Sequence, residues 1–467
     1  MKKIAKLLVI TLLAAVVAVA VFAAVACNSK DKHEHVDYVS QLQLDFSTDT
    51  KKQEVTVKLF IDGDTTHFDP VEDSKLTPGN KGDFKDTQGY IKARYLAINT
   101  PESTGQVEEW GKAASNFTRS KLESAESIIV ESNVNYWDID STGERYLLWV
   151  WYKPADSTEY RNLNVEILQE GLAFASRTSE GIYGEIAQKA LDQAQIEKLH
   201  LYSGEKDPDF YYGGIKYVSL KELRCFPEDY NGVKISVKGT VIGRYNNSAY
   251  VEAYDADTGL YFGMPVYYGF GATEMLLKTL SIGNKVEVVG TFSVSDTFGN
   301  QISGLTPLDG FNKNDPDVCK VLEPNVQPAF TKLEAPEKLN STSTVEVVTD
   351  REDENGNLIK VKMLYSEAID STSVTVENLY VKSAYTTDND GKSDGAMTLY
   401  CETADHKEVQ VRTDVLKNAQ GDLVLQSEFV GKTISIKGVV EKYTNKGKTT
   451  YQIKVYRYDY ITVLDAE

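Results

Sequence analysis

The chain has 467 residues, which predicts two to four domains rather than one. Hydrophobic residues make up 41% and aromatic residues 10%, so the chain can bury real cores and is not of the disordered class. The formal net charge of −19 excludes a protein that coats nucleic acid through bulk positive charge, because phosphate binding requires clustered Lys and Arg. Any nucleic-acid site must therefore be local, with its positive charge supplied by a few arginines or a metal ion.

The N-terminus has the pattern of an export signal, because three lysines among the first six residues precede an uncharged apolar run over residues 7–26. Small residues precede Cys27 and a polar stretch follows it. This pattern resembles a bacterial lipobox, which implies that Cys27 is the lipid-modified first residue of the mature chain. Ordinary cleavage with free secretion is an alternative, and the run is also long enough to span a bilayer uncleaved. We expect residues 1–27 to be a lipoprotein signal peptide and the body to be membrane-anchored on the extracellular side.

The following segment, residues 28–53, is polar and charged and is expected to act as a tether off the membrane. Beyond it, alternating and helical hydrophobic patterns succeed one another. The expected elements, in chain order, are strands over 54–68 and 90–98, a helix over 107–125, strands over 127–131 and 145–153, and helices over 162–170 and 183–199. A loop rich in Pro and Gly separates the first two strands.

Two short stretches gather oxygen ligands at the ends of strands. Asp62 and Asp64 follow the apolar residues Phe60 and Ile61 within the first strand segment, and Asn99, Thr100 and Glu102 follow the second. A β-scaffold delivers carboxylate, amide and carbonyl oxygens to a hard cation in this way. An isolated Asp-Gly-Asp is more typical of a plain turn, so the interpretation as a site depends on several motifs occurring in order.

That order resembles the staphylococcal nuclease (thermonuclease) family, whose core is an OB-type β-barrel, over residues 54–204. The matching motifs are Ile61-Asp62-Gly63-Asp64-Thr65, Arg94 with Asn99-Thr100-Pro101-Glu102, Glu109-Trp110-Gly111, Gly143 with Arg145, and Gln169-Glu170-Gly171-Leu172-Ala173. The resemblance implies a phosphodiester hydrolase, an endonuclease that uses Ca²⁺ and acts on DNA, with RNA as a second candidate substrate.

The resemblance also implies a role for each matched residue. Asp64, Asn99 and the Thr100 carbonyl would bind calcium with Asp62 behind them, Arg94 and Arg145 would bind the scissile phosphate, and Glu102 would activate the attacking water. A phosphodiester under in-line attack gains negative charge, so a cation and two guanidinium groups stabilise its transition state more than its ground state. Asn99 stands where the family has a second carboxylate, which removes one negative charge and should weaken calcium binding.

The second half of the chain is rich in strands. Residues 233–241 and 433–440 share a strand–Gly–strand pattern, and residues 285–292 are a looser copy. These units resemble small OB barrels, which we expect over residues 216–311 and 344–465, joined by a Pro-containing linker over 312–343. Short strands with regular turns would also fit an immunoglobulin-like sandwich. The expected fold class is thus mainly β with α, an OB-type nuclease barrel with three helices followed by two smaller OB-like barrels.

The last strands contain an unusual basic and aromatic stretch. Strand alternation places Lys454, Tyr456 and Tyr458 on one face, where they could contact phosphates and bases of single-stranded nucleic acid. Alternatively, the tyrosines are half-buried barrel residues and the lysines protect a sheet edge.

The sequence as a whole predicts a surface-anchored, calcium-dependent nuclease. The competing hypothesis is a non-catalytic protein that captures extracellular nucleic acid or another polymer. The joint presence of Asp64, Arg94, Glu102 and Arg145 favours the enzyme.

Overall fold

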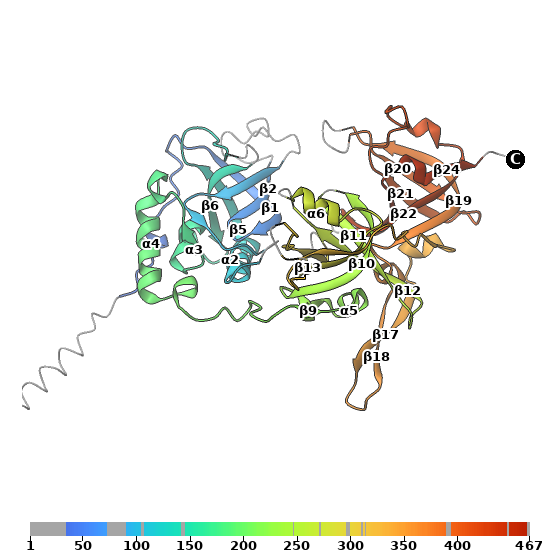
Figure 1. Cartoon of the computed structure of the whole chain (residues 1–467). Helices are drawn as coiled ribbons and strands as arrows, with labels where there is room; N and C mark the ends of the chain where they lie inside the picture. The colour runs from blue at the N-terminus through green and yellow to red at the C-terminus, as the bar shows by residue number, and fades with distance from the viewer. Residues whose placement is uncertain are drawn as a thin grey trace, which may run out of the picture.

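A computed structural model describes the chain from residue 34 to residue 464. The described residues are 34–71, 90–103, 107–141, 145–245, 247–269, 272–295, 299–309, 312, 314–388, 394–445 and 448–464. Cys27 and Gly143, on which predictions were made, lie outside them. Within these ranges no helix is long and apolar enough to cross a membrane. Figure 1 shows three β-barrels that follow one another along the chain, the first in blue to green, the second in yellow-green and the third in orange to red.

Five strands close the first barrel. They are β1 (Lys52–Asp62), β2 (Thr65–Pro70), β3 (Ile91–Tyr95), β5 (Ala125–Ser132) and β6 (Tyr146–Pro154). Neighbours pair in the order β3-β2-β1-β5-β6, and a parallel pairing between β3 and β6 closes the sheet on itself. Trp149 and Trp151 of β6 are fully buried. They anchor the core on which the site is built.

Three α-helices complete the first domain, as expected: α2 (Gly111–Glu123), α3 (Leu163–Gln169) and α4 (Gly184–Glu197). Every residue of α3 is buried, and its first turn is capped by the Asn162 side chain, which accepts a hydrogen bond from the Val165 N–H. In Figure 1, α3 lies between the barrel strands and α4. The apolar faces of these helices explain why β6 is buried on both sides.

The expected tether is wrong from residue 34 onward, because this segment packs on the first domain. Val39, in a short 3₁₀ turn, is fully buried, and Leu42 and Leu44 pack against the same core. Arg161 donates from Nη1 to Asp37 Oδ2 over 3.0 Å. Apolar residues spaced among the polar ones therefore attach the segment to the domain.

The second and third barrels repeat the strand order of the first. The second consists of β10 (Lys234–Tyr245), β11 (Ser248–Asp255), β12 (Leu260–Tyr267), β13 (Lys285–Ser293) and β14 (Gln301–Ser303). The third consists of β19 (Ser373–Thr386), β20 (Met397–Glu402), β21 (Glu408–Thr413), β22 (Thr433–Asn445) and β23 (Lys448–Val455). In each barrel the first strand pairs with the second and fourth, and the third runs parallel to the fifth. The OB-type prediction is confirmed.

The strand–Gly–strand repeats occupy different places in these barrels. Residues 433–440 lie on β22, the fourth strand of its barrel, and the looser copy lies on the equivalent strand β13. By contrast, residues 234–241 of the remaining copy lie on β10, a first strand. A Cβ atom on Gly290 would lie 2.6 Å from the Ser303 carbonyl, and one on Gly438 would lie 2.6 Å from the Lys454 carbonyl. Both glycines thus allow the fourth strand to approach the fifth closely.

The boundaries of these barrels differ from the expected ones. Inside the expected linker, β15 (Lys320–Glu323) pairs with β13, and β16 (Thr331–Lys332) pairs with β19. The hairpin of β17 (Thr344–Glu352) and β18 (Leu358–Leu364) forms a sheet of its own and points away from the barrels in Figure 1. The remaining elements include β9 (Lys216–Tyr217), α5 (Leu220–Cys225), α6 (Glu274–Thr279), α7 (Tyr365–Ala368) and β24 (Ile461–Leu464).

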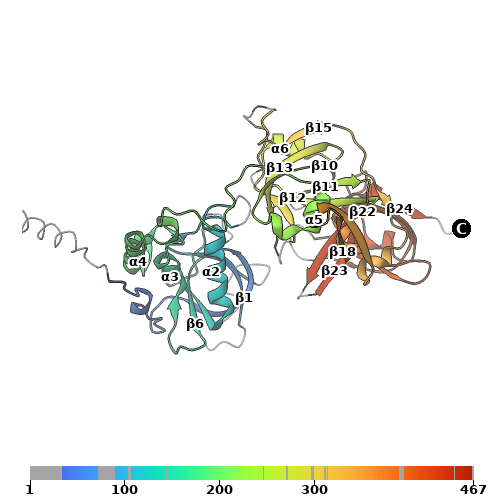
Figure 2. The same ribbon diagram turned by 90° about the horizontal axis from the view of Figure 1, so that it is seen from below.

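The second and third barrels pack against each other, as Figure 2 shows from below. The Glu252 carboxylate is 2% exposed and accepts hydrogen bonds of 2.7 Å from both the N–H and the hydroxyl of Ser373. Arg224 pairs with Asp370 at 3.2 Å across the same junction. Buried polar contacts of this kind fix one relative arrangement of the two barrels, because each group depends on a partner from the other barrel.

Candidate active site

The turn between β1 and β2 forms the floor of the site. Gly63 is required there, because a Cβ atom would lie 2.9 Å from side-chain atoms of both Thr100 and Ala114. This close approach packs the turn against the strand end at Thr100 and against helix α2. As a result, the Asp64 side chain is only 1% exposed although it lies in a turn.

Asp64 is held by three groups. Its Oδ2 accepts a hydrogen bond of 2.8 Å from the Thr100 N–H, and its Oδ1 accepts one of 2.9 Å from the Thr65 hydroxyl and also contacts Arg94 Nη1. Burial raises the pKa of this carboxyl, and the Arg94 charge and the hydrogen bonds lower it, with a net increase. The carboxylate is thus fixed in position with one oxygen directed at a cationic group.

Asn99 approaches the same cationic group from β4 (Ile98–Asn99), which pairs with β8 (Phe174–Ala175). Arg94 Nη2 donates to Asn99 Oδ1 over 2.5 Å. One guanidinium therefore bridges the two side chains predicted to bind calcium. Asp64 and Asn99 converge on a shared position that accepts positive charge.

The residues at this position fit a hard divalent cation. Carboxylate and amide oxygens are preferred ligands of Ca²⁺, and the predicted third ligand, the Thr100 carbonyl, belongs to the residue whose N–H donates to Asp64. In the same part of the chain, no group of three or more His, Cys, Asp or Glu side chains could hold a metal. Calcium would therefore depend on neutral oxygens beside Asp64, consistent with a weak site.

Asp62 lies beside Glu102, and it is also close enough to Asp64 for its charge to add to the effect of burial in raising the pKa of the Asp64 carboxyl. Its Oδ1 accepts hydrogen bonds from Ser103, 2.8 Å from the N–H and 2.5 Å from the hydroxyl. Burial, and then a hydrogen bond with Glu102, raise the pKa of Asp62 to about 7. Glu102 itself is exposed. Sequence reasoning missed Ser103, whose role follows from its distance to Asp62 and not from any motif.

Arg145 lies directly before β6, on the strand next to Arg94. The parallel register pairs Arg94 with Leu147, two residues beyond Arg145. Arg145 Nε donates to Asp140 Oδ2 over 2.7 Å, a partner that the sequence analysis did not identify. The fold thus places the two predicted phosphate-binding arginines at neighbouring strands, Arg94 on β3 and Arg145 directly before β6.

The predicted nucleic-acid face on the last strands is wrong for Lys454 and Tyr456. Lys454 is 3% exposed and its Nζ lies 3.9 Å from the centre of the Tyr245 ring, which belongs to the second barrel. Tyr456 is half-buried and packs against Tyr245. The predicted strand alternation is correct, because Lys454 lies on the outer face of the third barrel, but the second barrel covers that face. Tyr458 lies apart from them, with its hydroxyl donating to Glu428 over 3.0 Å.

A closed five-stranded barrel with an oxygen-rich turn, and with arginines at two neighbouring strands, supports a nuclease-type fold. Residues 92–204 match the family model described as "Staphylococcal nuclease homologue". The chain thus contains a staphylococcal nuclease-like domain, and the match includes Arg94, Asn99, Glu102 and Arg145. No curated protein matches the chain.

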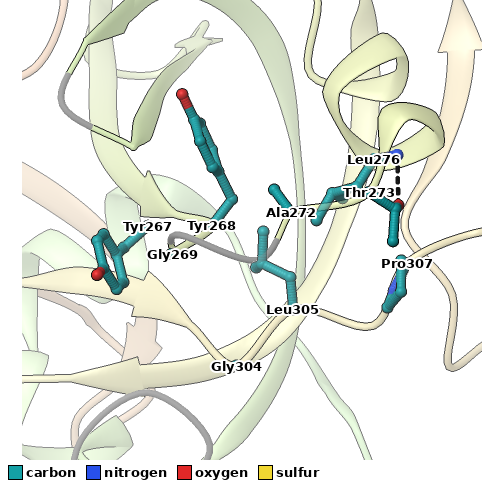
Figure 3. Close-up of a pocket in the computed structure, with 9 residues that line it drawn as sticks. All are labelled: Tyr267, Tyr268, Gly269, Ala272, Thr273, Leu276, Gly304, Leu305 and Pro307. Carbon is teal, nitrogen blue, oxygen red and sulfur yellow. Dashed lines mark hydrogen bonds between the residues drawn. The ribbon is translucent and has the colours of Figure 1, made fainter. Parts of the chain in front are cut away.

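A cavity of about 310 Å³ lies in the second barrel, separate from these residues. Figure 3 shows its lining, including Tyr268, Leu305 and Thr273, whose hydroxyl accepts a hydrogen bond of 3.2 Å from the Leu276 N–H. None of the nine lining residues carries a carboxylate, an imidazole or a cationic group. The cavity therefore offers no groups for phosphodiester chemistry.

Proposed function

We propose that the chain is a calcium-dependent nuclease that hydrolyses phosphodiester bonds of DNA, and of RNA as a second substrate. The observation that carries the proposal is the convergence of the Asp64 and Asn99 oxygens on the Arg94 guanidinium. It joins the predicted metal ligands and a predicted phosphate-binding group in one place.

Arg94 and Arg145 would hold the scissile phosphate. Guanidinium groups are planar and permanently charged, so they pair with two phosphate oxygens at once and stabilise the charge that grows there during in-line attack. Glu102, exposed beside the site, would accept a proton from the attacking water. When bound, Ca²⁺ would supply further positive charge to the phosphate oxygens.

Arg94 has two competing roles in this arrangement. The Asp64 and Asn99 oxygens that it contacts are the ones assigned to calcium, and they cannot serve both cations at the same positions. Binding of the metal would therefore release the guanidinium from these oxygens and make it available to the substrate. This exchange predicts that calcium is required for the correct placement of Arg94 as well as for its own charge.

We also propose that the enzyme acts outside the cytoplasm, anchored through a lipid on Cys27. The export-signal pattern and the small residues before Cys27 support this location. Secretion without an anchor is the alternative.

The proposal is tested by incubating residues 28–467 with single- and double-stranded DNA and RNA, in calcium or in a calcium chelator. We expect calcium-dependent cleavage, and Glu102→Gln serves as a matched variant that should bind substrate but cleave it slowly. Binding without cleavage by the unmodified chain, in calcium, would instead support the capture-protein hypothesis.

A further inference from the structure

The segment between the first and second barrels docks on the nuclease-like domain. Its residue Asp207 is 3% exposed and lies beyond the family match, which ends at residue 204. The Trp110 N–H donates to Asp207 Oδ2 over 2.6 Å, and the Asp209 N–H donates to Asp207 Oδ1 over 2.9 Å. A buried carboxylate from the connecting segment thus contacts the turn that leads into α2.

This turn depends on support from outside its own sequence. Trp110 adopts a left-handed backbone conformation with φ of 66° and provides no side-chain cap for α2. Non-glycine residues adopt this conformation at some energetic cost. Asp207 accepts from the N–H of Trp110, the residue that precedes the helix, and its negative charge lies at the positive end of the helix dipole.

The same turn holds the backbone of Glu102. The Glu108 N–H donates to the Glu102 carbonyl over 2.9 Å, and the Glu102 N–H donates to Glu108 Oε2 over 3.1 Å. A Cβ atom on Gly111 would lie 2.2 Å from the Glu102 carbonyl oxygen, so the start of α2 lies directly against this residue. A displacement of the turn would therefore displace Glu102.

We propose that Asp207 is a positioning residue for the nuclease site, fixing the turn at 108–111 and, through it, the backbone from which Glu102 projects. The inference rests on the proposed function, in which Glu102 activates water. Because a displacement of about 1 Å can cost about 10² in rate, a contact remote from the substrate can control turnover. The site is thus completed by a residue of the connecting segment.

The first test compares variants of the full-length chain. Asp207→Ala should lower kcat about tenfold or more and leave KM within about twofold, because Asp207 does not face the substrate. Asp207→Asn keeps one of the two oxygens that accept from the Trp110 and Asp209 N–H groups, but loses the charge, and should recover part of the rate. Asp209→Ala removes an exposed carboxylate two residues away and should behave like the unmodified chain. An inactive Asp207→Asn, or equal losses in Asp209→Ala, would contradict the proposal.

The second test asks whether Asp207 acts through Glu102. In a Glu102→Gln background, Asp207→Ala should cause little further loss, because the group that it positions is already disabled. An equal fold-loss in both backgrounds would overturn the proposal and indicate a general structural effect.

Hydrogen exchange gives a readout that does not depend on catalysis. Amides of residues 107–114 should exchange faster in Asp207→Ala than in Asp209→Ala, because the turn loses its buried acceptor. Unchanged exchange would overturn the proposed contact. If the unmodified chain cleaves no nucleic acid, the proposed function fails, whereas faster exchange still supports the hold of Asp207 on the turn.

Discussion

Arg94 donates a hydrogen bond of 2.5 Å to Asn99 Oδ1. The two side chains come from strands β3 and β4, and the same guanidinium also contacts Asp64. The guanidinium that we propose to bind the substrate phosphate therefore contacts both side chains that we propose to bind calcium. Substitutions at these residues should affect calcium dependence and turnover together.

Replacing either arginine should disable the site. Arg94→Ala or Arg145→Ala should lower turnover by about 10² or more while the fold persists, because the lost contact belongs mainly to the transition state. Arg119→Ala is a suitable control, since Arg119 pairs with Glu123 on the surface of α2. Steady-state rates measured with a fluorescent DNA substrate check the prediction. Rates near those of the unmodified chain in both variants would remove the arginines from the mechanism.

Restoring an acid at residue 99 should tighten calcium. Asn99→Asp adds one negative charge beside Asp64, and a divalent cation gains more from that charge than the singly charged Arg94 does. The calcium concentration that gives half-maximal rate should fall, and calorimetry should show tighter binding. If neither quantity changes, Asn99 is not a ligand.

Tyr456 should matter for stability rather than for nucleic-acid binding. Its ring lies 5.7 Å from that of Tyr245 and 6.1 Å from that of Tyr250, between the second and third barrels. Tyr456→Ala should cost about 3 kcal/mol of unfolding free energy, because it leaves a void in this contact. Tyr385→Ala, at a side chain 56% exposed, is the matched control. Denaturant unfolding measures both, and equal stabilities would show that the contact contributes little.

Glu252 should make the stability of the two C-terminal barrels depend on pH. Burial raises its pKa, although hydrogen bonds from Ser373 and Ala329 oppose the change. Because the folded-state pKa lies above the unfolded value of about 4.3, the stabilisation from this carboxyl is fully present below that pH and is lost as pH rises through the folded value.

The comparison that isolates this effect uses Glu252→Gln, which does not titrate. The unfolding free energy of the unmodified chain minus that of the variant should decrease as pH rises from about 4 toward neutrality. Thermal unfolding at several pH values measures the difference. A difference that grows with pH would mean that the hydrogen bonds outweigh burial and that the folded pKa is lowered.

Cys27→Ser tests the anchor. We expect loss of lipid labelling and release of the chain from membranes, because the lipobox-like pattern requires a thiol. Cys225→Ser should retain both properties, since Cys225 lies in α5 and far along the chain. Membrane retention without lipid labelling would indicate an uncleaved apolar segment instead.

The nuclease-like domain and the OB class could be predicted because their signals are local. The signals are Asp, Asn and Thr at the ends of strands and Gly at bends. Each acts through residues close to it in the sequence, so its pattern can be identified without knowing the fold. The positions of Ser103 and Asp207 could not be predicted in this way. Each acts through a contact with a distant residue, and Asp207 reaches Trp110 across 97 positions.

The burial of Lys454 shows a second limit. Alternation correctly separates Lys454 from Ile453, which faces the core of its own barrel. It carries no information on whether another domain covers the outer face. The same limit explains the docked segment near Val39, where a few apolar residues within a polar stretch find a partner surface that only the fold creates.

The docking of residues 34–51 limits how far the nuclease-like domain could lie from a lipid on Cys27. If Cys27 carries a lipid, only the six residues 28–33 separate it from the part of the chain that packs on the domain. At about 3.5 Å per extended residue, they allow a separation of about 20 Å. The nuclease-like domain would then remain close to the bilayer surface. On the proposed function, nucleic acid would then be cleaved only where it comes close to the membrane surface.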